Sequence, residues 1–430
     1  MALHDAPAAR PGQLDRTFGV GGKVQTDFDG NSDYGRGLAL QPDGKLVVVG
    51  FSGVYPGFNS AVARHNSDGS LDTTFGNGGI VISHFSTTDS LDAVAIQSDG
   101  KIVVVGSAQA TSGNNGTNVL VARYNSNGTL DTTFGTNGAV ITKLRSNIPP
   151  SWYFSASAQD VAVLADGKIL VAGQTTSVAF GRMALLRYNS NGTLDQTYGD
   201  AGKVITEFPV GPNGVNGGVG ANALALQADG KAVLAGSYVD NSFSEFALAR
   251  INPDGSPDTT FGTDGRVTTS IGSGDGVALE VLMQPDGKIV AGGYFQAGIK
   301  NRDFALARYN TDGTLDTSFG RGGIITNDLT NGSDDEIISM VLQADNRIIA
   351  AGETGQYPSF DFGLARYTTT GRLDNTFGQK GKVSTDFGKG SFDIAYGVVI
   401  GPDGKIVVAG ETNAGSSGDF DFALARYLNP

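Results

Sequence analysis

The side chains of this chain that could carry chemistry are carboxylates, arginines and three histidines, since the 430 residues include no cysteine. Without cysteine there is no disulfide, no thiolate zinc site and no cysteine nucleophile. The histidines His4, His65 and His84 form no His-x-x-Glu-His arrangement, and no Gly-x-Ser-x-Gly motif or phosphate-binding loop is found. We therefore name no catalytic residue.

Acidic side chains recur at two fixed distances from other repeated residues. Ten residues before a repeated Asp-Gly-Lys turn stand Asp33, Asp89, Asp335 and Asp393. Five residues before a repeated arginine stand Glu245, Asp303, Asp361 and Asp421. Oxygen ligands of this kind suit a hard cation such as Ca²⁺, so the first four are candidate metal ligands at the mouth of a channel. The alternative is that they cap strand ends and are solvated.

Two further sets of charges recur in every repeat and are best interpreted as structural. The arginines are Arg64, Arg123, Arg187, Arg250, Arg308, Arg366 and Arg426. The aspartates are Asp15, Asp72, Asp131, Asp195, Asp258, Asp316 and Asp374. A single active site does not need seven copies of a residue. An arginine fork held by carboxylates or backbone carbonyls would instead fix the connection between two strands.

One segment breaks the regularity and is the candidate ligand-binding site. It contains Arg145, the only tryptophan, Trp152, and the adjacent Tyr153 and Phe154, and Arg182 belongs to the same repeat. Such a cluster could stack a sugar or hold an acidic peptide. The alternative is that the loop folds back and fills the channel with its aromatic rings.

These residues must be positioned by a unit that the chain repeats seven times. The hexapeptide Leu-Asp-x-Thr-Phe-Gly, with single substitutions in three copies, begins at Leu14, Leu71, Leu130, Leu194, Pro257, Leu315 and Leu373. The Asp-Gly-Lys turn and the Ala-Arg-Tyr run recur in the same order, and only Asp345-Asn-Arg departs from the turn. A period of about sixty residues indicates a repeat architecture with one domain over residues 1–430.

Each unit is expected to fold into four antiparallel strands. In residues 278–327, two short apolar runs are joined by Pro285-Asp-Gly, which favours a hairpin. The runs 304–309 and 323–327 supply a third and a fourth strand, and no segment has a helical period with caps. Seven such units predict an all-β, seven-bladed β-propeller.

The two ends of the chain are expected to complete one blade. Residues 23–27 form a fourth-type strand without a partner before it, and residues 422–427 form a third-type strand without a partner after it. Pairing them removes both open edges. The first strand of each unit should then be innermost. The connections after the second and fourth strands vary and emerge on one face, which is the candidate binding surface.

The units resemble delta-60 repeats, a bacterial family. The match is carried by Ala39-Leu-Gln-Pro-Asp-Gly-Lys45 and Phe304-Ala-Leu-Ala-Arg-Tyr-Asn310, and it spans roughly residues 14–427. The resemblance implies a propeller, often in secreted or surface proteins, and supplies no catalytic residue. The amino terminus itself shows no signal-peptide pattern.

The charge balance limits the class of partner. Lysine and arginine number 30 against 43 aspartate and glutamate, for a net charge of −13. An acidic chain lacks the basic surface that nucleic acid needs, and no stretch reaches transmembrane length. We expect a monomeric, non-enzymatic scaffold that binds a protein or glycan. The alternatives are a hydrolase or lyase with a carboxylate-bound metal, and a lectin-like propeller.

Overall fold

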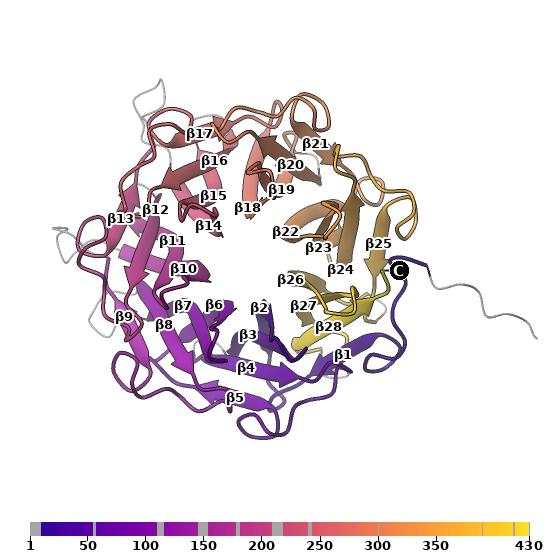
Figure 1. Ribbon diagram of the computed structural model, residues 1–430. Coiled ribbons are helices and arrows are strands. Elements are labelled where there is room, and N and C mark those ends of the chain that lie inside the picture. Colours follow the sequence, from indigo (N-terminus) through magenta and orange to yellow (C-terminus); the bar gives the residue numbers. More distant parts are fainter. Residues whose placement is uncertain are drawn as a thin grey trace, which may run out of the picture.

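The chain folds into a ring of seven four-stranded sheets (Figure 1). The computed structural model describes residues 10–54, 57–109, 116–144, 154–177, 181–208, 218–239, 243–299, 301–388, 390–415 and 418–429. The predicted all-β, seven-bladed propeller is confirmed. Within the described ranges, no helix has the length and apolarity needed to cross a membrane.

In each blade the first strand lies nearest the axis, as predicted, and the second strand pairs with it (Figure 1). The innermost strands of blades 1 to 7 are β2 (Asp33–Leu40), β6 (Asp89–Ile96), β10 (Phe154–Val163), β14 (Val219–Leu226), β18 (Asp275–Met283), β22 (Asp334–Leu342) and β26 (Asp393–Ile400). The second strands are β3 (Leu46–Ser52), β7 (Ile102–Gln109), β11 (Ile169–Ser177), β15 (Ala232–Val239), β19 (Ile289–Gln296), β23 (Ile348–Gln356) and β27 (Ile406–Thr412).

The third and fourth strands continue each blade outward. The third strands are β4 (Asn59–His65), β8 (Thr117–Tyr124), β12 (Gly181–Tyr188), β16 (Ser244–Ile251), β20 (Arg302–Tyr309), β24 (Ser359–Tyr367) and β28 (Asp421–Tyr427). The fourth strands are β5 (Ile80–Ser83), β9 (Ala139–Thr142), β13 (Lys203–Thr206), β17 (Arg266–Thr269), β21 (Ile324–Asn327), β25 (Lys382–Thr385) and β1 (Lys23–Thr26).

The ring is closed by the two ends of the chain, as the unpaired terminal strands predicted. Strand β1 pairs antiparallel with β28, with Lys23 opposite Ala425 and Thr26 opposite Phe422. Outside the strands, the amide of Gly12 donates to the carbonyl of Leu428 at 2.7 Å. Blade 7 is therefore built from both termini, and no sheet edge is left open between blades 7 and 1.

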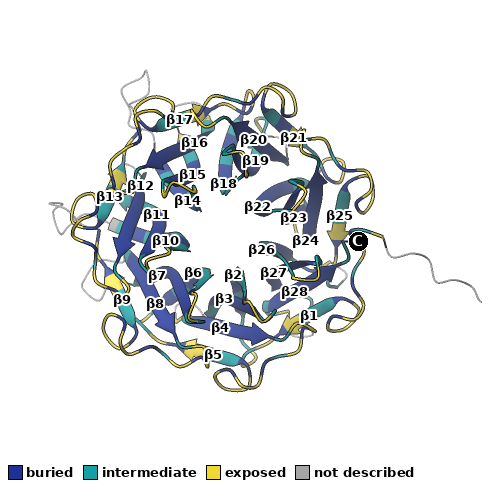
Figure 2. Ribbon diagram, viewed as in Figure 1, coloured by how far each residue is buried: buried dark blue, intermediate teal, exposed yellow. Residues whose placement is uncertain are grey.

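The core lies between neighbouring blades. The second and third strands are buried on both faces, because each sheet is covered by the blade on either side (Figure 2). This explains why their sequences are nearly continuous apolar runs rather than alternating ones. The innermost strands use small residues where blades converge. A Cβ at Gly37, for example, would lie 3.0 Å from the Cα of Ala93 in blade 2.

Two connections of every blade emerge on the same face, which we call the variable face. These connections follow the second and the fourth strand, and their described parts include residues 27–32, 328–333 and 390–392. The opposite face carries the repeated turns. In the sixth blade the turn has Asn346 where the others have glycine, and its φ of 63° lies in the left-handed region that asparagine tolerates.

Candidate functional site

The repeated arginines form the same buried corner in each blade. In blade 5, Arg308 Nε donates to Asp316 Oδ2 at 2.8 Å, and the guanidinium lies 4.4 Å from the centre of the Phe319 ring. Its Nη1 donates to the carbonyl of Thr369 in the next blade at 2.7 Å. All seven arginines are buried and stack on the aromatic ring of the hexapeptide. The corner ties each blade to its neighbour.

A second cation completes this corner. Lys288 of the Asp-Gly-Lys turn lies 3.1 Å from Asp316, and the hydroxyl of Ser318 donates to the same carboxylate. Burial alone would raise the pKa of Asp316, but these hydrogen bonds and the charge of Arg308 hold it well below its usual range. The carboxylate therefore stays ionised under ordinary conditions, as a structural ion pair requires.

The four candidate metal ligands all lie at the start, or the second residue, of an innermost strand, on the variable face. They are fully or almost fully buried. Each accepts a hydrogen bond of 2.6–2.9 Å from a backbone amide of the preceding connection; the donors are Phe28, Phe85, Leu329 and Phe387. Each aspartate side chain thus points toward the junction between two blades, where its hydrogen bond holds the preceding connection in place. The structure does not bring the four together in one ring of ligand atoms.

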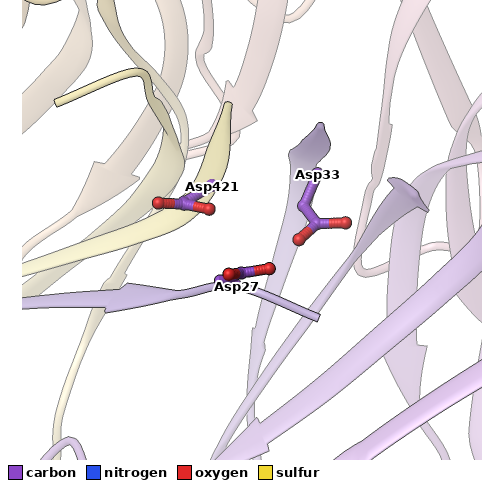
Figure 3. Close-up of side chains that lie close together, drawn as sticks. All are labelled: Asp27, Asp33 and Asp421. Carbon is purple, nitrogen blue, oxygen red and sulfur yellow. The ribbon is translucent and has the colours of Figure 1, made fainter. Parts of the chain in front are cut away.

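Three of them instead belong to separate triads of aspartates. Asp33 groups with Asp27 and Asp421, and Figure 3 shows their carboxylates facing one another from β2, the end of β1 and the start of β28. The equivalent triads are Asp303, Asp328 and Asp335, and Asp361, Asp386 and Asp393. In each triad one oxygen of every carboxylate lies within 4.8 Å of the others. The third member, which follows the fourth strand, was not among the residues singled out from the sequence.

The first triad has the chemistry of a site for a hard cation. Burial raises the pKa of Asp33 to about 7, and the nearby Asp29 and Asp27 add to that shift. Burial likewise raises the pKa of Asp421 to about 6. Asp33 Oδ1 is buried, and its nearest side-chain partner is the hydroxyl of Ser52. Three carboxylates held this close fit the oxygen-only ligand set that Ca²⁺ prefers.

Junctions outside blades 5, 6, 7 and 1 carry a different set of residues at these positions. Between blades 3 and 4, Arg182 Nε lies 2.8 Å from Glu207, so a cation from the chain itself sits beside the carboxylate. Between blades 2 and 3 the positions hold Lys143, Asn118 and Ala156. Acidic triads are thus confined, among the described residues, to three consecutive junctions.

The structure describes only two of the five residues in the predicted aromatic site. Arg145, Trp152 and Tyr153 lie outside the described residues. Phe154 opens β10, where its backbone is opposite Ser177. Arg182 lies on β12 of the same blade and is half-exposed in its ion pair with Glu207. The proposed contact between the loop and Arg182 therefore stays a prediction.

A different aromatic cluster lies at the variable face, across blades 6, 7 and 1. Its rings contact one another in a continuous strip, with centroids 4.7–5.9 Å apart. The strip consists of Phe360, Phe392, Phe420, Tyr34, Phe51 and Phe58. All except Phe360 are partly exposed. We call this the aromatic strip.

The axis of the ring holds a cavity of about 720 Å³. Every innermost strand has a β-bulge at its centre, which leaves one residue without a partner on the second strand. These residues line the cavity, and they differ in each blade: Arg36, Asp92, Gln159, Asn222, Leu279, Ile338 and Tyr396. Bulges re-aim side chains in this way near functional sites. Seven different side chains, one from each repeated blade, therefore line the same cavity.

The cavity and the aromatic strip are continuous. Phe51 and Phe392 belong to the strip and also line the cavity. The guanidinium of Arg36 lies 4.0 Å from the centre of the Tyr396 ring and 5.6 Å from that of Phe51. The variable face thus has a mouth that is aromatic on one side and opens onto a charged interior.

Fold and site together define a rigid seven-bladed propeller with one non-repetitive cavity on its axis. The chain belongs to the family described as a beta-propeller domain of unknown function, DUF5122, which matches residues 41–75, 97–134, 164–198, 227–261, 284–319, 343–377 and 401–429. The seven matches coincide with the seven repeats. No functionally curated protein matches the chain.

Solved structures share the fold at low sequence identity. The polysaccharide lyase Uly1 aligns with a TM-score of 0.51 and 13% identity, over 94% of this chain and 91% of its own. A protein of unknown function from Dyadobacter fermentans aligns with a TM-score of 0.51 and 11% identity, over 95% and 98%. An ulvan lyase aligns with a TM-score of 0.50 and 12% identity, over 94% and 96%. At these identities the likeness concerns the fold alone.

Proposed function

We propose that this chain is a rigid, non-enzymatic scaffold that binds a ligand or a protein partner through its variable face. The observation that carries the proposal is the half-exposed aromatic strip at the mouth of the axial cavity. Partly exposed aromatic rings around a pocket are typical of recognition sites. The repeated corners hold the blades rigid, so the site needs little ordering when a ligand binds.

The tips of the variable face support the same proposal. Val54, Phe243, Ile299 and Tyr357 are large apolar side chains exposed on connections after second strands. The opposite face repeats polar turns that differ little between blades. Apolar side chains held on connections at one face of a rigid ring are a common arrangement for binding another protein.

The test is a calorimetric titration of the full chain with panels of peptides and oligosaccharides, with and without Ca²⁺. Binding by a panel member should weaken in Trp152→Ala, Arg182→Ala or Phe51→Ala protein. Arg321→Ala, at an exposed residue preceding a fourth strand, is the matched control. Binding that is unchanged by all three variants would count against the variable face.

A hydrolase or lyase with a carboxylate-bound metal is a second candidate, and the aspartate triads favour it. Asp27, Asp33 and Asp421 would hold a Ca²⁺ ion near the mouth, where a bound cation can polarise a substrate oxygen. A lectin-like role is a third candidate, because a strip of rings suits the flat face of a sugar. We also infer that the repeats are of the delta-60 type, on the motif match at residues 39–45 and 304–310.

A further inference from the structure

The axial cavity is lined by more acidic than basic side chains. Among the described residues, five carboxyl groups and two guanidinium groups line it. Both guanidinium groups already have partners. Arg36 lies 3.6 Å from Glu411 and stacks on Tyr396, and Arg302 is ion-paired with Glu336. The positive charges of both arginines are therefore already paired with carboxylates of the chain.

The other four carboxyl groups lack such a partner. Asp92, Asp160, Glu280 and Glu353 have no ion pair within 4.0 Å in the described part of the chain. Asp160 accepts the amides of Leu224 and Val161, both at 2.7 Å. Glu280 accepts the amide of Val281 at 2.9 Å and the hydroxyl of Ser339 at 3.3 Å.

Glu353 is the most informative of these groups. It is only 8% exposed, it lines the cavity, and neither a hydrogen bond nor an ion pair to its side chain is found among the described residues. A buried polar group without a partner is costly, because it has lost water and gained nothing in return. A ligand that brings a donor and a positive charge would remove that cost.

The arrangement does not suit a single metal ion. The four carboxyl groups come from blades 2, 3, 5 and 6, and none belongs to a group of ligand atoms close enough to share an ion. Carboxyl groups that line one cavity from four different blades suit a ligand with several positive charges instead. Phe51, Phe392 and Tyr396 form an aromatic wall of the cavity. Arg36 already stacks on Tyr396 and lies near Phe51, so the ring of Phe392 is the one that a further cation can approach.

We propose that the axial cavity binds a small organic cation that carries two or more ammonium groups. Each ammonium group can donate to a carboxylate on one wall while the aliphatic part of the ligand packs against the aromatic wall. A cavity of about 720 Å³ lies in the size range of small-molecule sites. The inference rests on the proposed function, because it names the ligand class of the same mouth and cavity.

The protonation of these groups is consistent with such a ligand. Burial, together with the charge of Asp160, raises the pKa of Glu280 to about 8. Burial raises the pKa of Glu353 to about 7, against the opposing charge of Arg302. A bound ammonium group stabilises the ionised carboxylate, so binding near neutral pH should release protons.

The experiment is calorimetric titration of the full chain with spermidine at about 150 mM salt, which screens non-specific attraction to an acidic surface. We expect saturable binding with one site per chain. Glu353→Gln should weaken it roughly tenfold, since one charge-assisted hydrogen bond is lost. Asp200→Asn, at an exposed acid outside the cavity, should leave it unchanged. Titrations in two buffers of different ionisation enthalpy should reveal the released protons.

Several outcomes overturn the inference. One is no saturable heat with spermidine. Another is equal weakening by Asp200→Asn and Glu353→Gln, which indicates attraction to overall charge only. A third is binding of a neutral oligosaccharide, but not spermidine, that Glu353→Gln abolishes. If spermidine fails while a peptide or glycan of the panel still binds and is sensitive to Phe51→Ala, the cavity inference alone is lost. If none binds, the proposed function fails as well.

Discussion

Arg308 and Asp316 form a buried ion pair, 2.8 Å between Nε and Oδ2, beneath the ring of Phe319. The pair joins the third strand of blade 5 to the hexapeptide, and the carbonyl of Thr369 extends it into blade 6. The same corner occurs in each blade. This geometry indicates that the repeated arginines and aspartates have a structural role, which is to connect neighbouring blades.

Removing one corner should weaken the whole ring. Arg308→Ala leaves Asp316 buried without its main partner, and we expect a loss of about 3–5 kcal/mol in the free energy of unfolding. Arg308→Lys should recover part of it, because lysine keeps the charge and loses the fork geometry. Urea unfolding gives the values. Arg321→Ala, at an exposed arginine, should stay within about 0.5 kcal/mol of wild type, and a similar small loss for Arg308→Ala would contradict this assignment.

Opening blade 7 should destabilise the protein as a unit. A chain that lacks residues 1–28 has no β1, so the edge of β28 is exposed and its pairing with residues 23–26 is lost. We expect a lower midpoint of thermal unfolding and a tendency to associate through that edge. A chain that lacks only residues 1–9 retains β1 and serves as the control. Equal stability of the two shortened chains would show that closure contributes little.

Stability should fall as the pH rises from about 5 to 8. Burial raises the pKa of Asp92 and Asp160 to about 6, of Glu411 to about 7 and of Glu280 to about 8. Between the unfolded and folded pKa values, the native state therefore binds more protons than the unfolded state, and raising the pH favours unfolding. The hexapeptide aspartates have lowered pKa values, so their contribution is lost only below about pH 4.

Glu280→Gln isolates one of these carboxyl groups. The variant should be more stable than wild type at pH 8 and close to wild type at pH 5. The expected gain at pH 8 is on the order of 1–2 kcal/mol, because Glu280 lines the cavity and is only partly buried. Urea unfolding across pH 4–9 measures the difference in the free energy of unfolding at both pH values. If the free energy of unfolding of the wild type rises steadily from pH 5 to pH 8, burial in the axial cavity does not raise the pKa values of these carboxyl groups.

The aspartate triads predict stabilisation by Ca²⁺. An ion bound only by the folded state adds about 2.7 kcal/mol at a hundredfold excess over its Kd. Asp421→Asn should reduce the thermal shift, because the triad with Asp27 and Asp33 loses one charged ligand. Asp264→Asn, at a largely exposed carboxylate, is the control. Absence of any Ca²⁺-dependent shift in wild type, or the same reduction in both variants, would remove the metal hypothesis.

The sequence predicts the fold well because three markers repeat in every unit. The order of the markers places the strands, and the unmatched strands at 23–27 and 422–427 predict how the ring closes. Strand ends are less accurate: β18 begins at Asp275, three residues before the apolar run that starts at Ala278. The pairing of β18 with β19 extends beyond the apolar residues, and backbone pairing does not need an apolar side chain.

The candidate site is harder to predict, because its residues do not repeat. The bulge positions hold residues as different as Arg36 and Leu279, so no pattern marks them. The aromatic strip unites Tyr34 near one end of the chain with Phe420 near the other, and only ring closure brings them to 5.1 Å. Two members of each aspartate triad could be found by position. The third, such as Asp27, follows a four-residue strand and has no marker of its own.

The most direct test of the account is hydrogen exchange of the full chain, free and bound to the tightest ligand of the peptide, oligosaccharide and polyamine panels. The account predicts slower exchange in the connections of the variable face, such as residues 27–33 and 386–393, and in the innermost strands that line the cavity. Exchange at the opposite turns, such as residues 41–45, should not change. Protection confined to those opposite turns, or no binding by any member of the three panels, would contradict the assignment of function to the variable face.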